Sequence, residues 1–159
     1  MFLKNVESLR NYAAGFAREL RPPVCVALHG ELGVGKTEFA RAAIRAMCGE
    51  DIVVPSPTFT LVQEYEIQSP ESGGQIPPSG FQTFHFDLYR VNSAEELEEI
   101  GFFDVISSGL VFVEWPEIAA GFLPENTMHV YLSVSGAGRE VTVDPCMKPS
   151  YPVGFSSAQ

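Results

Sequence analysis

One segment near the start of the chain has the residue spacing that binds phosphate groups. Gly30–Thr37 reads GELGVGKT and matches G-x-x-x-x-G-K-[ST] without a gap. Its glycines let the backbone wrap around an anion and point N–H groups inward, and the helix expected after it adds a positive N-terminal end. Lys36 is placed to reach the outer phosphates, and the Thr37 hydroxyl is placed to bind Mg²⁺. The segment therefore predicts a site for ATP or a close relative together with Mg²⁺.

The flanking segments supply the strand and the helix that this loop requires. Val24–Leu28 is a short apolar run, as expected of a buried parallel strand, and Lys36–Cys48 is expected to form a helix that ends near Gly49. A plain glycine turn would leave Lys36 at the start of its helix without a role. The residues predicted to contact the nucleotide here are Gly30, Gly33, Val34, Gly35, Lys36, Thr37 and Glu38.

Two carboxylates stand where neighbouring strands are expected to end. Asp87 follows the apolar run 84–86, and Glu114 follows the apolar run 110–113. A phosphate-binding enzyme needs a carboxylate at such a strand end to orient Mg²⁺ or the attacking water, and strand ends lie at the ligand-binding edge of a parallel sheet. The alternative for each is an ordinary surface charge or a helix cap.

The rest of the chain predicts strands that alternate with helices. A helix is expected over 5–20 and shorter helical segments over 93–101, where Ser93 and Glu96 form a capping box, and 102–108. Further strands are expected over 52–54, 60–67, 81–86, 110–113, 127–134 and 140–143. This order predicts a three-layer α/β sandwich of the P-loop NTPase type, with a mainly parallel central sheet and antiparallel additions.

Length and charge limit the domain organisation and the partners. The chain has 159 residues, so we expect one domain over 1–144, a hairpin tip rich in Pro, Gly and Ser over 69–80, and a flexible tail over 145–159. Its charged N-terminal segment does not resemble a signal peptide, and no apolar run could span a bilayer, which favours the cytoplasm. The formal net charge is −10. Direct binding to nucleic acid is therefore not expected, because it relies on clustered Lys and Arg.

Several classes of P-loop protein lack support. The N-K-x-D tetrapeptide with which GTPases read guanine is missing, as is an arginine-rich loop that could serve as the lid of a small-molecule kinase.

Five segments in order are instead similar to those of the TsaE family (formerly YjeE): HGELGVGKTEFAR, VPSPTFTLVQEYE, FHFDLYRV, EELEEIGFFD and VFVEWPE. The resemblance runs from about Gly30 to Glu117, with a weaker match at GRE over 138–140.

The resemblance implies roles for the chemically active residues. Lys36 and Thr37 would bind phosphate and Mg²⁺, Asp87 of FDLYR would be the Walker-B-like carboxylate near the metal, and Glu114 of VEWPE would be a metal-linked or water-activating carboxylate. Lys36, Asp87 and Glu114 are thus the candidate catalytic residues. Thr37, Asp87 and Glu114 are the candidate metal ligands.

Three further residues receive roles from the same resemblance. Thr58 of SPTF would sense the γ-phosphate, Trp115 would lie near the nucleotide, and Arg139 of GRE would approach its base or sugar. The alternatives are an ordinary turn threonine for Thr58 and a core aromatic for Trp115. His29 and His85 lie in or beside core strands, and we interpret both as structural.

The resemblance also implies an activity and partners. The family supplies the ATPase of bacterial threonylcarbamoyladenosine synthesis on tRNA, together with a catalytic and a scaffold subunit of the carbamoyl-transferase fold. ATP hydrolysis there would reset the complex, and tRNA would be held only through those subunits. Two alternatives stay open: a nucleotide-gated binding module in which hydrolysis is incidental, and a small P-loop phosphotransferase.

The sequence departs from the family pattern at one position beside the phosphates. Glu38 follows Thr37 where the family has a second threonine. The substitution removes a hydroxyl that could reach the α-phosphate, and it brings a negative charge near the phosphates unless the side chain turns away.

Overall fold

A seven-stranded mixed sheet organises the molecule. The computed structural model describes residues 1–67 and 82–144, so the hairpin tip expected over 69–80 and the tail expected from 145 lie outside the described residues. The strand order is β1-β7-β6-β2-β5-β4-β3. The strands are β1 (Phe2–Leu3), β2 (Val24–His29), β3 (Val62–Glu66), β4 (Gln82–Asp87), β5 (Leu110–Glu114), β6 (Met128–Ser135) and β7 (Gly138–Asp144).

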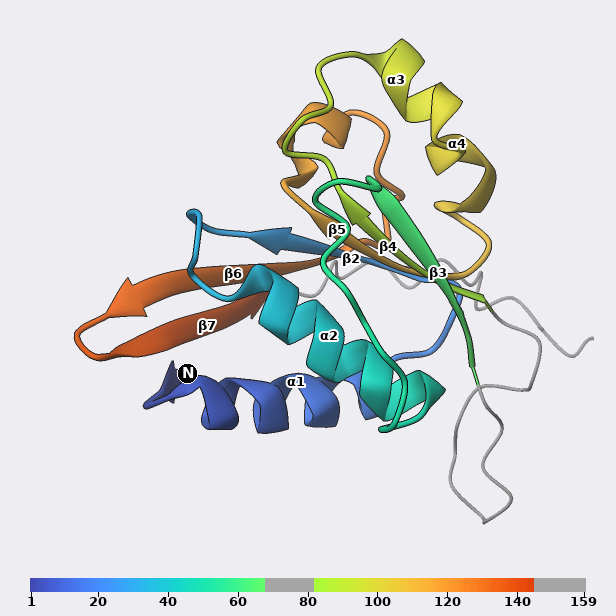
Figure 1. Cartoon of the computed structure of the whole chain (residues 1–159). Coiled ribbons are helices and arrows are strands. Elements are labelled where there is room, and N and C mark those ends of the chain that lie inside the picture. Colours follow the sequence, from blue (N-terminus) through green and yellow to red (C-terminus); the bar gives the residue numbers. More distant parts are fainter. Residues whose placement is uncertain (68–81, 145–159) are drawn as a thin grey trace, which may run out of the picture.

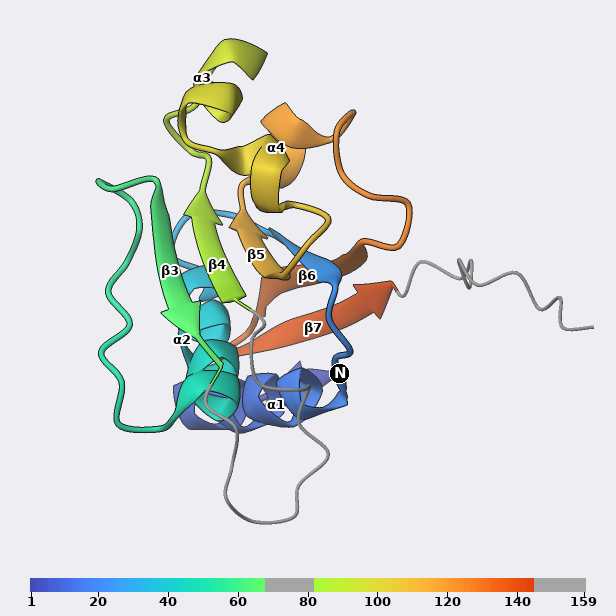
Figure 2. The same ribbon diagram turned by 90° about the vertical axis from the view of Figure 1, so that its right-hand side faces the viewer.

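The sheet is parallel at its centre and antiparallel at its edges. β6, β2, β5 and β4 form the parallel centre, while β7 and β1 on one side and β3 on the other pair antiparallel. Helices cover both faces: α1 (Val6–Glu19) and α2 (Lys36–Cys48) lie on one, and α3 (Ala94–Glu99), α4 (Phe102–Val105) and the 3₁₀ helix η1 (Pro116–Ala119) lie on the other (Figures 1 and 2). The predicted α/β class is confirmed.

The central strands are apolar throughout because both of their faces are buried. Val26 and Phe112 pack toward α1 and α2, whereas their neighbours Cys25 and Val111 pack toward α3, α4 and η1. Burial raises the pKa of Cys25 to about 12, so its thiol stays protonated and behaves as a small core group. This arrangement explains why the sequence shows runs rather than alternation at β2 and β5.

Two of the helices, α1 and α3, begin with a residue whose side chain caps the first turn. Asn5 precedes α1 and accepts a hydrogen bond from the N–H of Ser8 at 2.8 Å. Ser93 precedes α3 and accepts from the N–H of Glu96 at 3.3 Å, as the capping box predicts. The returning bond differs from the expected one, since the Glu96 carboxylate accepts from the N–H of Asn92.

Among the helices of residues 1–67 and 82–144, none combines the length and the apolar composition that a membrane span requires.

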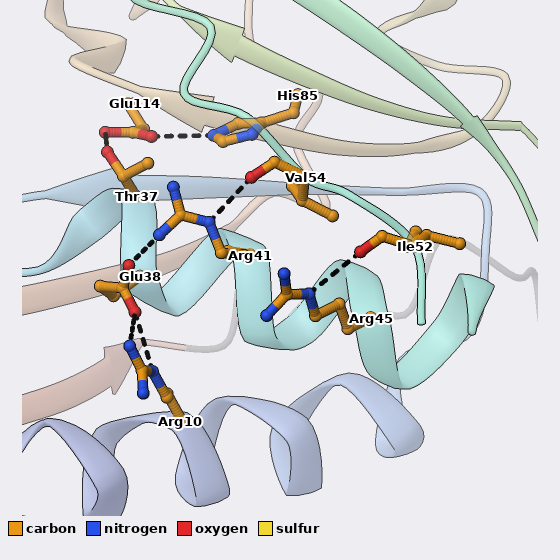
Figure 3. A network of polar contacts seen from close by, with 9 residues as sticks. All are labelled: Arg10, Thr37, Glu38, Arg41, Arg45, Ile52, Val54, His85 and Glu114. Carbon is orange, nitrogen blue, oxygen red and sulfur yellow. Dashed lines mark hydrogen bonds and ion pairs between the residues drawn. The ribbon is translucent and has the colours of Figure 1, made fainter. Parts of the chain in front are cut away.

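The predicted strand over 52–54 is wrong, and arginine side chains explain why. The backbone there is irregular. Arg45 donates from Nε to the carbonyl of Ile52 at 3.2 Å, and Arg41 donates from Nε to the carbonyl of Val54 at 2.8 Å (Figure 3). These carbonyls are therefore satisfied by α2 and not by a sheet ladder.

Strand register places the candidate carboxylates together. In the parallel pairs, Asp87 on β4 lies opposite Glu114 on β5, and Glu114 lies opposite Leu28 on β2. β2 continues directly into the predicted phosphate loop, so all three chain segments leave the sheet at the same edge. This is the edge at which open α/β sheets bind their ligands.

The central strands should carry much of the stability. We expect Phe112→Ala to lower the free energy of unfolding by about 3–5 kcal/mol, because it removes a fully buried aromatic ring. Phe59→Ala is the matched control, since its side chain is 82% exposed, and we expect a change below about 0.5 kcal/mol. Urea unfolding followed by circular dichroism measures both. Equal losses in the two variants would contradict this packing.

Candidate nucleotide-binding site

The predicted phosphate loop joins the end of β2 to the start of α2 in a conformation that requires glycine. Gly35 is the N-cap of α2, with φ at 117°. Gly30 has φ at 141°, and a Cβ added there would lie 2.4 Å from the carbonyl oxygen of Leu132. Both positions favour glycine for its freedom at positive φ, and Gly30 also for the close backbone approach. The N-terminus of a 13-residue helix thus faces the cavity beside the loop.

Nine of the predicted site residues line one cavity of about 320 Å³. They come from the phosphate loop and α2, from the 55–61 segment, and from the ends of β4 and β5. They are Gly33, Gly35, Lys36, Thr37, Glu38, Thr58, Asp87, Glu114 and Trp115. Gly30, Val34 and Arg139 are not among the lining residues.

Lys36 supplies a buried positive charge to this cavity. Its Nζ donates to the carbonyls of Gly30 at 2.6 Å and Glu31 at 2.9 Å. It also lies 3.8 Å from the centroid of the Trp115 ring. Burial lowers the pKa of Lys36, and the nearby carboxylates, Glu114 foremost, oppose that shift. The amine is therefore held at the cavity by carbonyl, aromatic and carboxylate groups together.

Trp115 is a wall of the cavity and not a core residue. It is half-buried, and its backbone has φ at 56°, in the left-handed region that a bulky residue rarely adopts. The ring of Tyr89 lies 4.9 Å from it, centroid to centroid. The strained backbone turns the indole over Lys36 at the point where β5 ends.

The two candidate carboxylates are buried and fully engaged. Asp87 accepts from the Thr58 hydroxyl at 2.9 Å through Oδ2 and from the N–H of Tyr89 at 3.0 Å through Oδ1. Glu114 accepts from the Thr37 hydroxyl at 2.9 Å through Oε2, and its Oε1 lies 2.8 Å from Nε2 of His85 (Figure 3). These bonds link Thr58 to β4 and link α2 to β5.

The oxygen atoms gathered here fit Mg²⁺. Thr37, Asp87 and Glu114 present a hydroxyl and two carboxylates, which are the hard ligands that this ion prefers. Within residues 1–67 and 82–144, no group of three or more His, Cys, Asp or Glu side chains could hold a metal ion alone. One hydroxyl and two carboxylates suit Mg²⁺, which usually keeps water and binds through one or two carboxylates plus substrate phosphates.

The Glu38 side chain is paired with two arginines. Its carboxylate accepts from Nε of Arg10 on α1 at 2.8 Å and from the guanidinium of Arg41 one helical turn along α2 (Figure 3). The negative charge that departs from the family pattern is therefore compensated by two cations. The pairing also ties α1 to α2 beside the cavity.

Arg139 contacts the loop backbone. Its Nε donates to the carbonyl of Val34 at 2.7 Å, while the side chain of Val34 is buried in the core below. A Cβ on Gly35 would lie 3.6 Å from the same nitrogen. Arg139 thus braces the loop from β7, and its contact with the base or sugar of a nucleotide stays a prediction.

Five residues that line or support the cavity were not among the predicted site residues: Leu32, Tyr89 and Arg90 line it, and His85 and Arg10 contact the lining residues Glu114 and Glu38. The structural interpretation of His85 does not include its contact with Glu114, although its position two residues before Asp87 places both on the same face of β4. The sequence pattern does not indicate a role for Arg10. Its contact with Glu38, which is 28 residues away in sequence, depends on how α1 packs against α2.

Comparison with known proteins identifies the family. Residues 3–141 match the family described as threonylcarbamoyl adenosine biosynthesis protein TsaE. This chain belongs to the TsaE family. The TsaE protein of Rickettsia bellii is 39% identical over 132 residues, which cover 83% of this chain and 84% of that protein. The TsaE protein of Haemophilus influenzae is 35% identical, over 74% of this chain and 68% of that protein.

A solved structure shows the same fold. The crystal structure of Bacillus subtilis YdiB superposes with a TM-score of 0.67, over 92% of this chain and 84% of that chain, at 22% sequence identity. The fold of this TsaE chain is thus seen in a crystal structure of much lower sequence similarity.

The pairing of Glu38 leads to a prediction about nucleotide affinity. We expect Arg10→Ala to weaken ATP binding about two- to fivefold at low salt, because it uncovers part of a negative charge at the cavity; exposed pairs are worth up to about 1 kcal/mol. Adding Glu38→Gln to this variant should restore the affinity. Arg18→Ala, an exposed arginine on the same helix, is the control. Calorimetric titration measures all four proteins, and a double variant as weak as Arg10→Ala would contradict the expectation.

Proposed function

We propose that this chain binds ATP with Mg²⁺ and hydrolyses it as a component of threonylcarbamoyladenosine synthesis on tRNA. The observation that carries the proposal is the meeting of Lys36, Thr37, Asp87 and Glu114 in one cavity beside a glycine-dependent phosphate loop. The pathway comes from the relatives, which are named tRNA threonylcarbamoyladenosine biosynthesis proteins.

The chain's own residues divide the work. The loop N–H groups and the Lys36 amine hold the phosphates, and the start of α2 adds its dipole. The Thr37 hydroxyl and Asp87 would hold Mg²⁺, which would neutralise charge on the phosphate oxygens. Glu114, at the end of β5, would help to hold the metal or would orient the attacking water. Thr58, bonded to Asp87, is placed to respond to the γ-phosphate.

Hydrolysis by the chain alone should be slow. Arg90 is the one arginine lining the cavity in the described residues, and its guanidinium lies 4.8 Å from the centroid of the Phe59 ring. Arg139, Arg10 and Arg41 are bonded to loop or helix groups. An arginine that neutralises the transition state accelerates such reactions strongly, so we propose that partner subunits complete the site.

The partners in this proposal are the catalytic and scaffold subunits of the pathway, in the cytoplasm. With a net charge of −10, the chain itself would contact tRNA only through them. Leu32 and Tyr89 are exposed hydrophobic residues that line the cavity, and the exposed Phe59 lies beside Arg90; such side chains suit contact with a protein partner.

ATP hydrolysis with purified components tests this proposal. We expect the chain to turn over slowly with Mg²⁺ alone and to be stimulated at least about tenfold by the two partner subunits with tRNA, as cation contributions to phosphoryl transfer allow. Lys36→Ala should abolish the stimulated rate because phosphate binding is lost. Lys4→Ala, an exposed lysine away from the cavity, is the control.

Two results would contradict the proposal. Equal rates with and without partners would indicate an independent enzyme, and labelled phosphate found on an acceptor other than water would indicate a phosphotransferase. Full tRNA modification by a Glu114→Ala variant that binds ATP without hydrolysing it would indicate a nucleotide-gated binding module.

A further inference from the structure

The buried histidine beside Glu114 is the feature that the proposed function leaves without a role. His85 has no exposed surface, and its Nε2 lies 2.8 Å from Oε1 of Glu114 (Figure 3). The other oxygen of the same carboxylate, Oε2, accepts the Thr37 hydroxyl at 2.9 Å. We infer that His85 is a positioning residue that holds the Glu114 carboxylate with one oxygen, Oε2, directed at Thr37. This inference rests on the proposed function, since it concerns the same site.

The surroundings of the ring fix its tautomer. An ionised carboxylate only accepts hydrogen bonds, so the proton shared with Glu114 belongs to Nε2 of His85. The second nitrogen, Nδ1, is buried and has no partner among the described residues. A proton on Nδ1 would be an unpaired buried donor, which is costly, whereas a lone pair there is less so. The ring therefore carries its hydrogen on Nε2, aimed at Oε1.

Packing alone does not account for a histidine at this position. Its strand neighbours Phe84 and Phe86 are apolar and pack on the opposite face of β4. On its own face, His85 is opposite Phe112 of β5 in the ladder. An apolar side chain of similar volume would fill that space, and replacing a buried polar pair with apolar groups is often neutral or stabilising. The polar contact with Glu114 thus has to be explained by what it does to Glu114.

The consequence concerns how Glu114 can meet the metal. The terminal torsion of a glutamate is broad, so an unrestrained carboxylate could turn either oxygen, or both, toward Thr37. With Oε1 engaged by His85, a single oxygen faces the Thr37 hydroxyl and the cavity. Glu114 then acts through Oε2 alone, and both its direction and that of the Thr37 hydroxyl are defined before the nucleotide arrives.

Two substitutions of similar shape separate positioning from packing. His85→Gln keeps an N–H donor that can reach Oε1, while His85→Met has comparable length and no donor. We expect the Met variant to need about 10- to 100-fold more Mg²⁺ for half-maximal enhancement of ATP binding, the range seen when a partner of a metal-site ligand is removed. ATP affinity in EDTA should match that of the wild type, and the Gln variant should stay close to it in both conditions. Equilibrium dialysis with labelled ATP gives these values, and thermal unfolding confirms that both variants fold.

The same Mg²⁺ requirement in the Met and Gln variants would overturn the inference. A second measurement uses the protein without nucleotide: ¹⁵N-detected imidazole NMR should show His85 with its proton on Nε2, and Glu114→Gln should move that resonance. A proton found on Nδ1 would overturn the inference regardless of any activity. A wild-type chain whose ATP affinity ignores Mg²⁺ would instead contradict the proposed function, so the two failures are distinguishable.

Discussion

The site depends on a single buried carboxylate that touches three elements at once. Glu114 ends β5, accepts a hydrogen bond from Thr37 at the start of α2, and is held from the other side by His85 on β4. Because only 2% of the residue is exposed, these contacts are made away from bulk water, where hydrogen bonds to a charged group count for more. The predicted phosphate loop, the Thr37 hydroxyl and the sheet are thereby fixed relative to one another.

The parallel register is what makes this meeting possible. β2, β5 and β4 run side by side in the same direction, so the phosphate loop, Glu114 and Asp87 leave the sheet at one edge. Asp87 then anchors Thr58 and the backbone of Tyr89 on the far side of the cavity. Trp115 follows Glu114 immediately, and its ring lies 3.8 Å from the Lys36 amine, so that both line the same cavity. Strand order and register therefore set the positions of the predicted phosphate loop, Glu114 and Asp87 without any contribution from a ligand.

Much of the fold and of the candidate site could be predicted from the sequence, for physical reasons that differ from residue to residue. The loop at Gly30–Thr37 carries its own geometry in its glycines, and α2 begins and ends where the pattern indicates. Asp87 and Glu114 could be placed because strand ends in a parallel sheet share an edge. The irregular backbone over 52–54 could not be predicted, since its carbonyls accept hydrogen bonds from arginines of α2. Arg10 and the pairing of Glu38 likewise depend on helix packing, and His85 depends on a contact between strands that spacing alone does not show.

The central claim is that Thr37, Asp87 and Glu114 form a metal site completed by nucleotide phosphates. Binding of Mn²⁺ in place of Mg²⁺ tests it directly, because Mn²⁺ has similar oxygen preferences and is visible by electron paramagnetic resonance. We expect the protein alone to bind Mn²⁺ weakly, the protein with ATP to bind one Mn²⁺ tightly, and Thr37→Val to lose most of that gain. Equally tight Mn²⁺ binding with and without ATP, or an unchanged gain in Thr37→Val, would contradict the site described here.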